Sequence, residues 1–190
     1  MEKMPAGNRI SIFVDGANLY KSASERKVRM DYPLLRRRLE GNREVVSALY
    51  FGSYKRDPLD PDETLRDEAF QAMVREAGFE LRLRPLKVEY FGLRVPRGVE
   101  FQMKAGEGVD TRTYREKGVD VALVTEMLIQ AWDDVYDTGV LVSGDNDYAA
   151  AARGIIKHEK QVEIVSFLHS AGRELIESAT RFVELQKLLS

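Results

Sequence analysis

The chain has 190 residues, of which 44% are apolar and 32% charged. This composition is typical of a globular protein large enough to bury one core. No run approaches the roughly 18 apolar residues of a membrane helix, and residues 1–9 lack the apolar segment of a signal peptide. The absence of cysteine excludes disulfides, thiolate zinc sites and a cysteine nucleophile. We therefore expect a cytoplasmic protein without membrane contact, with a tail (1–9) before a single domain (10–190).

The net charge is only −2, but the charges are segregated along the chain. Between Lys21 and Arg43, eight basic and three acidic residues give +5, and between Arg82 and Lys117, nine basic and five acidic residues give +4. The remainder therefore carries −11. Two basic segments beside an acidic remainder suit a protein that binds a polyanion and keeps metal ligands. Two solvated basic faces would give the same counts.

The first half of the chain alternates between apolar runs and helical periodicity. It predicts strands at 10–14, 45–51 and 79–84, and helices at 16–27, 32–39 and 63–77. Asp62 is expected to cap the third helix, and Gly78 to end it. Residues 85–117 are less regular and predict a β-hairpin insertion or flap, with a turn around Pro96–Gly98 and its second arm at 97–104.

The second half continues the alternation. A long helix is expected from Gly118 to about Asp134, and its nearly continuous apolar residues predict burial on more than one side. Further elements are expected as strands at 139–142 and 162–167, a helix at 145–157, an element at 174–178, and a short strand near 181–183. Strands that alternate with helices predict an α/β fold with a mainly parallel sheet covered on both faces.

Acidic residues stand at the edges of the apolar runs. Asp15 follows the first strand, Asp120 opens the long helix, and Asp145 and Asp147 follow the strand at 139–142. The carboxyl ends of parallel strands are where open α/β sheets place their sites. Carboxylates gathered there repel one another unless a cation lies between them, and Mg²⁺, often with a phosphate, is the usual cation. Each acid alone is also an ordinary turn or helix-capping residue.

Other candidates are weaker, or exclude particular chemistries. Asp110 lies in the irregular insertion and ranks below the other four acids. The two histidines do not form a metal or triad pattern, and no glycine run has the spacing of a phosphate-binding loop. The candidates for substrate contact are Asn18, Ser143, Asn146 and Arg153.

Three ordered blocks of the chain resemble the NYN family of PIN-like ribonucleases, in particular its LabA-like branch. The matching blocks are IFVDGANLY (12–20), KGVDVALVTEML (117–128) and VLVSGDNDYAAAARGI (140–155). The resemblance implies a Rossmann-like, three-layer α/β/α sandwich whose sheet has five or six strands. It also implies an acidic pocket that binds one or two Mg²⁺ or Mn²⁺ ions. The family's acidic positions fall on Asp15, Asp120, Asp145 and Asp147, and its polar companion falls on Asn18.

The function that this resemblance implies is metal-dependent hydrolysis of RNA, with single-stranded RNA as the first expectation. A binding or assembly module on the same fold, without catalysis, is the main alternative. A phosphohydrolase with an aspartyl nucleophile is disfavoured, because Asp15 is followed by Gly16 and Ala17 and not by a second Asp at position 17. The insertion and the apolar helix after Asp120 make a homodimer a candidate assembly.

Overall fold

The computed structural model describes residues 8–55, 61–90 and 112–190. Its centre is a six-stranded sheet in which every neighbouring pair of strands is parallel. In spatial order the strands are β3 (Glu80–Pro85), β2 (Glu44–Tyr54), β1 (Arg9–Asp15), β6 (Thr138–Val142), β7 (Gln161–Ser166) and β8 (Arg181–Glu184). The predicted α/β class and parallel sheet are confirmed.

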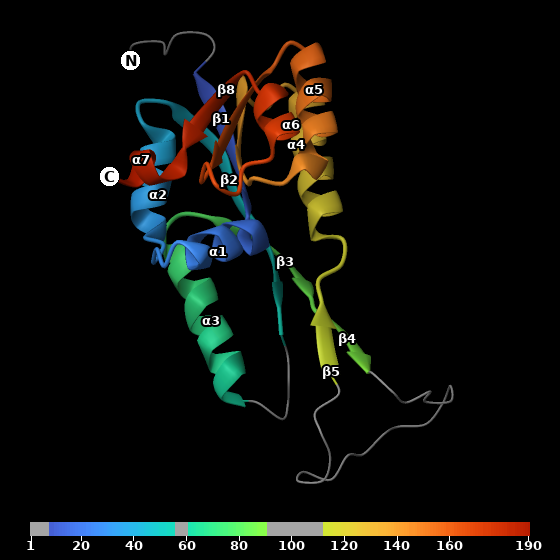
Figure 1. Ribbon diagram of the computed structural model, residues 1–190. Coiled ribbons are helices and arrows are strands. Elements are labelled where there is room, and N and C mark those ends of the chain that lie inside the picture. Colours follow the sequence, from blue (N-terminus) through green and yellow to red (C-terminus); the bar gives the residue numbers. More distant parts are fainter. Residues whose placement is uncertain (1–7, 56–60, 91–111) are drawn as a thin grey trace.

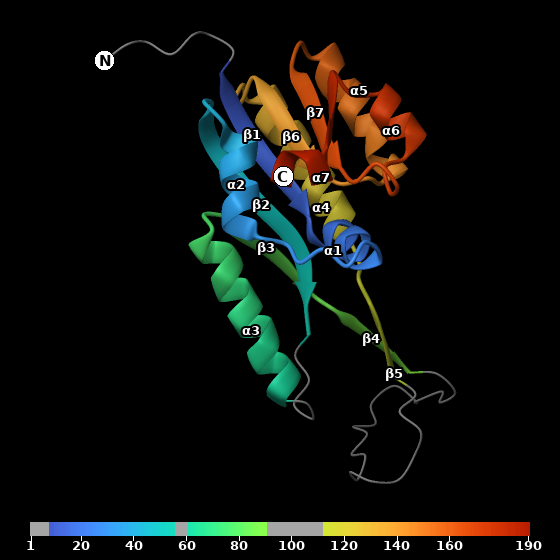
Figure 2. The same cartoon turned by 60° about the vertical axis from the view of Figure 1, so that its left-hand side comes forward.

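Helices cover both faces of the sheet, which makes three layers (Figures 1 and 2). One face carries α1 (Gly16–Glu25), α2 (Tyr32–Glu40), α3 (Pro61–Glu76) and α7 (Leu185–Leu189), and the other carries α4 (Val119–Trp132), α5 (Ala149–Lys157) and α6 (Arg173–Glu177). The strand β1 serves both layers, since Ile12 and Val14 pack into the first core and Phe13 into the second. This alternation is the two-residue period of a strand buried on both sides.

The order of the strands places a topological switch point between β1 and β6. From β1 the chain builds outward through β2 and β3, and it later returns to build β6, β7 and β8 on the other side. In the ladder, Val14 lies opposite Val142, so that Asp15 and Ser143 leave the sheet next to each other. Ligands of open α/β sheets bind at such a point, outside the carboxyl ends of the strands.

The insertion forms a two-stranded arm. Its strands β4 (Lys87–Tyr90) and β5 (Arg112–Arg115) pair antiparallel and extend away from the main sheet (Figure 1). The strand β4 falls in the segment expected to form a hairpin, but its partner β5 lies later in the chain than the predicted second arm. The predicted turn at 96–98, the predicted second arm at 97–104, and Asp110 lie outside the described residues.

Two local expectations are wrong. The helix α3 begins at Pro61, one residue before the expected cap position at Asp62; proline fits a first helical position, where no amide hydrogen is needed. The helix α4 is not buried on several sides, because Val121, Ile129 and Trp132 are 69%, 50% and 53% exposed. This helix lies in an outer layer, so only the side that faces the sheet is covered.

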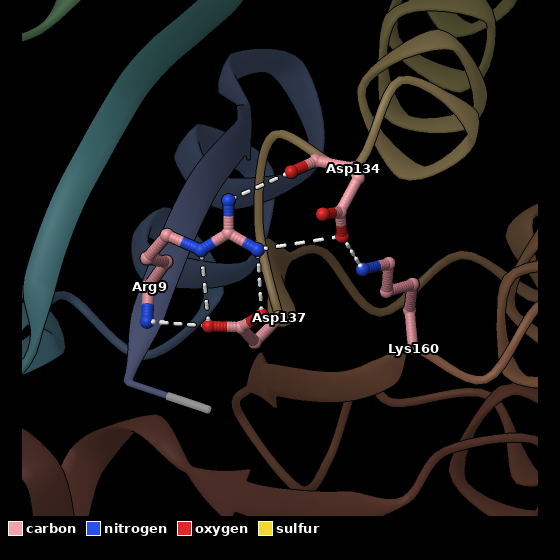
Figure 3. A network of polar contacts seen from close by, with 4 residues as sticks. All are labelled: Arg9, Asp134, Asp137 and Lys160. Atoms are coloured by element: carbon pink, nitrogen blue, oxygen red, sulfur yellow. Dashed lines mark hydrogen bonds and ion pairs between the residues drawn. The ribbon is translucent and has the colours of Figure 1, made fainter. Parts of the chain in front are cut away.

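The amino end of the sheet is held by an ion-pair network (Figure 3). Arg9, at the start of β1, contacts Asp137 at 2.8 Å and Asp134 at 3.3 Å, and Lys160 also pairs with Asp134. The hydrogen bond with Lys160 holds the pKa of Asp134 below its ordinary value, and the hydrogen bond with Arg9 does the same for the pKa of Asp137. Of the helices in the described ranges, none has the length and apolar character to cross a membrane.

Candidate acidic site

Asp15 is the centre of the acidic site. It ends β1, is only 3% exposed, and accepts three hydrogen bonds. Its Oδ1 accepts from the Asn18 amide at 3.0 Å, which caps α1, and its Oδ2 accepts from the hydroxyls of Ser143 at 2.9 Å and Tyr148 at 3.2 Å. Burial raises the pKa of Asp15, and the charge of Asp120 raises it further. Asp15 therefore caps α1 while its second oxygen accepts hydrogen bonds from side chains of the loop after β6.

The hydroxyl of Tyr148 joins Asp15 to Asp120. It lies 3.2 Å from Asp15 Oδ2 and 3.0 Å from Asp120 Oδ1, so carboxylates from β1 and from the first turn of α4 converge. Burial and the two carboxylate charges raise the pKa of Tyr148, which keeps its hydroxyl protonated. A hydroxyl has only one proton to donate, so it cannot satisfy both carboxylates at once. Asp120 is exposed, so its carboxylate is open to water or to a bound cation on that side when Tyr148 donates to Asp15.

A further carboxylate, Glu116, belongs to this site and was not expected. It lies between β5 and α4, and the Ser53 hydroxyl at the end of β2 donates a hydrogen bond to its Oε2. Burial raises the pKa of Glu116, and the charges of Asp15 and Asp120 raise it further. In the sequence it is one acid in an irregular, mixed-charge segment, and no local pattern distinguishes it from a surface residue.

Asn18 and Ser143 connect the two loops that frame the site. Asn18 Oδ1 accepts a hydrogen bond from the Gly144 amide at 2.9 Å, and Ser143 Oγ accepts one from the Asp145 amide at 3.2 Å. Since Ser143 also donates to Asp15, the turn after β1 and the loop after β6 are fixed to each other. Both residues were expected to contact substrate, but their observed contacts position the carboxylate and the loop.

Asp145 and Asp147 lie in the loop after β6, at the same end of the sheet. Asp145 Oδ1 accepts from the Asp147 amide at 3.0 Å and so caps the short 3-10 turn η1 (Asn146–Tyr148). Asp147 is exposed. Within the described residues, neither side chain hydrogen-bonds to Asp15 or Asp120. The structure therefore brings Asp15 and Asp120 into one hydrogen-bonded unit and leaves Asp145 and Asp147 beside it.

The two remaining candidates for substrate contact are engaged elsewhere. Asn146 Oδ1 accepts from the Leu175 amide at 3.1 Å and thus fixes α6. Arg153, on α5, pairs with Glu174 at 3.0 Å. Both contacts are structural ones with α6, and neither residue touches the carboxylates described above.

No described lysine or arginine forms an ion pair with a carboxylate of the site. A cation close to the start of α4 is Arg84, on β3. Its guanidinium lies beside Gly118: a β-carbon added to that glycine would be 3.9 Å from Arg84 Nη1. Gly118 has φ +77°, a conformation that glycine adopts without strain. Among the described residues, no basic side chain therefore neutralises these carboxylates.

The donor set fits a hydrated divalent metal. In the part of the chain that the structure describes, no three acidic or imidazole side chains are close enough to hold one ion together. Mg²⁺, however, is commonly bound by one or two carboxylates, with water and substrate phosphate as its other ligands. Asp15 and Asp120 supply two hard oxygen donors that contact one shared hydroxyl, and Asp120 is open to solvent. These two residues would hold such an ion.

The fold and this site define a class of protein: a parallel α/β sandwich whose carboxylates meet at the switch point. The model of the NYN domain family matches residues 9–186, and the chain belongs to this family. The resemblance found in the three sequence blocks is thereby confirmed.

Two relatives extend the comparison. The low amplitude and bright protein LabA of Synechococcus elongatus is 25% identical over 186 residues, which cover 96% of this chain and 87% of LabA. A crystal structure of a protein of unknown function from Vibrio parahaemolyticus has a TM-score of 0.67 and 24% identity, covering 94% of this chain and 93% of that one. At that identity, the likeness supports the fold.

Proposed function

We propose that this protein is a metal-dependent ribonuclease that hydrolyses phosphodiester bonds in single-stranded RNA. The observation that carries the proposal is the pair Asp15 and Asp120, two carboxylates that share one hydroxyl proton and have no described cation. Membership of the NYN family adds to it, because NYN domains belong to the PIN-like nucleases. One or two Mg²⁺ or Mn²⁺ ions would be held by these two residues, with Asp145 and Asp147 acting through water.

Bound there, the metal would supply Lewis acidity at the scissile phosphate and favour ionisation of a water molecule. The chain's own residues hold the reactants. Tyr148 and Ser143 keep the Asp15 carboxylate in one orientation. Glu116 suits the role of general base, since its raised pKa lies nearer to neutral pH than that of an ordinary glutamate.

The basic residues of the two positive segments are proposed to hold flanking phosphates. Arg84, on β3, places its guanidinium beside Gly118, just before α4, and Lys21 is exposed on α1, the helix that follows Asp15. Contacts of this kind do not depend on sequence and weaken with salt. A strand of RNA that crosses the site would therefore be bound through its backbone near the acidic residues.

The direct test is cleavage of a 5′-labelled single-stranded RNA in Mn²⁺, Mg²⁺ or EDTA. The parent protein is expected to cut with metal and not with EDTA. Asp15→Asn and Asp145→Asn, which both retain a capping side chain, are expected to lose cutting. Asp134→Asn, at the amino end of the sheet, is the matched control and should cut normally. Equal cutting by the parent protein and Asp15→Asn, with both proteins folded, would overturn the proposal.

A non-catalytic RNA-binding or assembly module is the second candidate. The observation that favours it is that, among the described side chains, no three acidic or imidazole groups are close enough to hold one metal ion together. On this account the carboxylates would shape a surface without carrying out chemistry. RNA binding that persists in EDTA, together with no cutting in either metal, would support this function over the first.

A further inference from the structure

A cavity of about 430 Å³ lies next to the acidic site and has no role in the chemistry proposed above. It is bounded by α1, α3, β2 and β3, and Gly16 and Glu116 form its side toward the carboxylates. Gly16 directly follows Asp15, so the cavity begins one residue from the centre of the site. Its volume lies within the range of small-molecule sites and is ample for a nucleoside.

The walls of this cavity are largely apolar and include aromatic rings. Phe70 is held in place by edge-to-face contacts with Tyr32 at 5.6 Å and with Tyr50 at 6.0 Å between ring centroids. Tyr20, on the outer side of α1, is 71% exposed and also lines the cavity. Leu83 adds an aliphatic surface from β3. A rigid aromatic wall with a second, accessible ring is a suitable surface for a flat, conjugated ligand.

The charged groups that line the cavity are all hydrogen-bond acceptors. The carboxylates of Asp67 and Glu116 line it, and none of its described lining residues is lysine or arginine. One oxygen of Asp67 accepts the Lys55 amide at 3.1 Å, and the other has no hydrogen-bond donor among the described residues. Such a cavity disfavours a phosphate and favours an uncharged ligand that donates hydrogen bonds.

We propose that this cavity binds the base of the nucleotide next to the scissile phosphate, and that it prefers bases with an exocyclic amino group over uracil. The position of the pocket rests on the proposed nuclease function, since the phosphate would lie at Asp15 and Asp120. Adenine, cytosine and guanine each have an exocyclic amino group that can donate a hydrogen bond to Asp67. Uracil has two carbonyls and one ring N–H in its place. The acidic residues would then determine which phosphodiester bond is cut, and the cavity would determine which base lies beside that bond.

The binding test uses the full chain in EDTA, with adenosine and uridine as probes and amide chemical shifts as the readout. Adenosine is expected to bind more tightly than uridine, and Tyr20→Ala to weaken adenosine binding at least about fivefold through lost stacking. Asp67→Asn should reduce the preference for adenosine over uridine. Trp132→Ala, an exposed aromatic on the opposite face of the sheet, is the control and should leave binding unchanged. Equal binding of the two nucleosides, or none at millimolar concentration, would overturn the proposal.

A cleavage test separates this proposal from the nuclease itself. The products of an RNA of mixed sequence, cut in Mn²⁺, are mapped for the parent protein, Tyr20→Ala and Trp132→Ala. Cuts beside A, C or G that exceed those beside U, with a weaker bias and a higher KM in Tyr20→Ala, are the expected result. Cutting without base bias overturns the pocket and leaves the nuclease standing. Absence of all cutting, with nucleoside binding retained, overturns the nuclease and leaves the pocket as a base-binding site.

Discussion

The two ends of the sheet treat their carboxylates in opposite ways. At the amino end, Asp134 and Asp137 are paired with Arg9 and Lys160, and their pKa values are lowered (Figure 3). At the carboxyl end, Asp15 is buried and has no described ion-pair partner, and burial, reinforced by the charge of Asp120, raises its pKa. The acids at the amino end are neutralised by ion pairs, whereas Asp15 at the carboxyl end has no neutralising partner among the described residues.

The contrast matters because the chain neutralises buried acids elsewhere. Glu163, inside the sheet on β7, has a side chain that is 6% exposed and pairs with Arg43 at 2.8 Å and Arg181 at 2.9 Å. A buried carboxylate without a counter-ion costs free energy of folding. The absence of such a partner at Asp15, among the described residues, is therefore the feature that most needs a functional explanation.

The largest expected effect follows from Asp15→Asn. RNA cleavage should fall about a thousandfold, because the best-positioned metal ligand is lost.

The free energy of unfolding of Asp15→Asn should not fall with its activity. The raised pKa of Asp15 means that the folded state holds a proton more tightly than the unfolded state, so the parent loses stability as pH rises from about 4 through that pKa. Urea unfolding in EDTA at pH 7 should therefore find Asp15→Asn as stable as the parent protein or more so. A clear loss of stability would show that the carboxylate serves the fold.

Glu116→Gln tests the acid that the sequence did not reveal. Cleavage should fall by about one to two orders of magnitude if Glu116 accepts the proton of the attacking water. Its raised pKa places the acidic limb of the pH–rate profile above the ordinary glutamate value of about 4.3, and that limb should vanish in the variant. An unchanged profile would assign the proton to another group.

Tyr148→Phe removes the hydroxyl that joins Asp15 and Asp120. We expect cleavage to fall about tenfold, since a group that orients metal ligands is lost. The unfolding free energy in EDTA should fall by about 1–2 kcal/mol, because a buried hydrogen bond to a charged group is removed. Added Mn²⁺ should restore part of that loss. Equal destabilisation with and without metal would separate Tyr148 from the metal site.

The smallest effect is expected at the other end of the sheet. Asp137→Asn should leave cleavage unchanged and lower the midpoint of urea unfolding at pH 7. The lowered pKa of Asp137 means that its stabilisation is complete above its unfolded-state pKa of about 3.9 and is lost as pH falls through the folded value. The difference between the variant and the parent should therefore shrink only below about pH 4. Reduced cleavage in this variant would break the comparison between the two ends.

Sequence reasoning was most successful where the signal is periodic. The alternation of strands and helices predicts the parallel sheet, and the positions of Asp15, Asp120, Asp145 and Asp147 at strand and helix ends predict that they lie at one rim of it. It was less successful at α4, whose apolar face at Val121 and Trp132 proved exposed, because hydropathy reports what a helix can bury and not which layer covers it. The start of α3 was also misjudged, because proline and aspartate both mark helix starts.

The details of the site depended on long-range contacts. Glu116 reaches the site through the arm β4–β5 and its hydrogen bond with Ser53, 63 residues earlier in the chain. Tyr148, from the loop after β6, connects the carboxylates of β1 and α4 through its hydroxyl. Neither contact has a local sequence pattern, because each joins elements that only the sheet order brings together.

The most direct test of the account is Mn²⁺ binding measured by electron paramagnetic resonance, which does not depend on catalysis. Three proteins are compared: the parent, the double variant Asp15→Asn/Asp120→Asn, and the double variant Asp134→Asn/Asp137→Asn. We predict that the parent protein and the amino-end variant bind Mn²⁺ alike and that the carboxyl-end variant does not. Equal binding by the parent protein and the carboxyl-end variant, or no binding by the parent protein, would contradict the account.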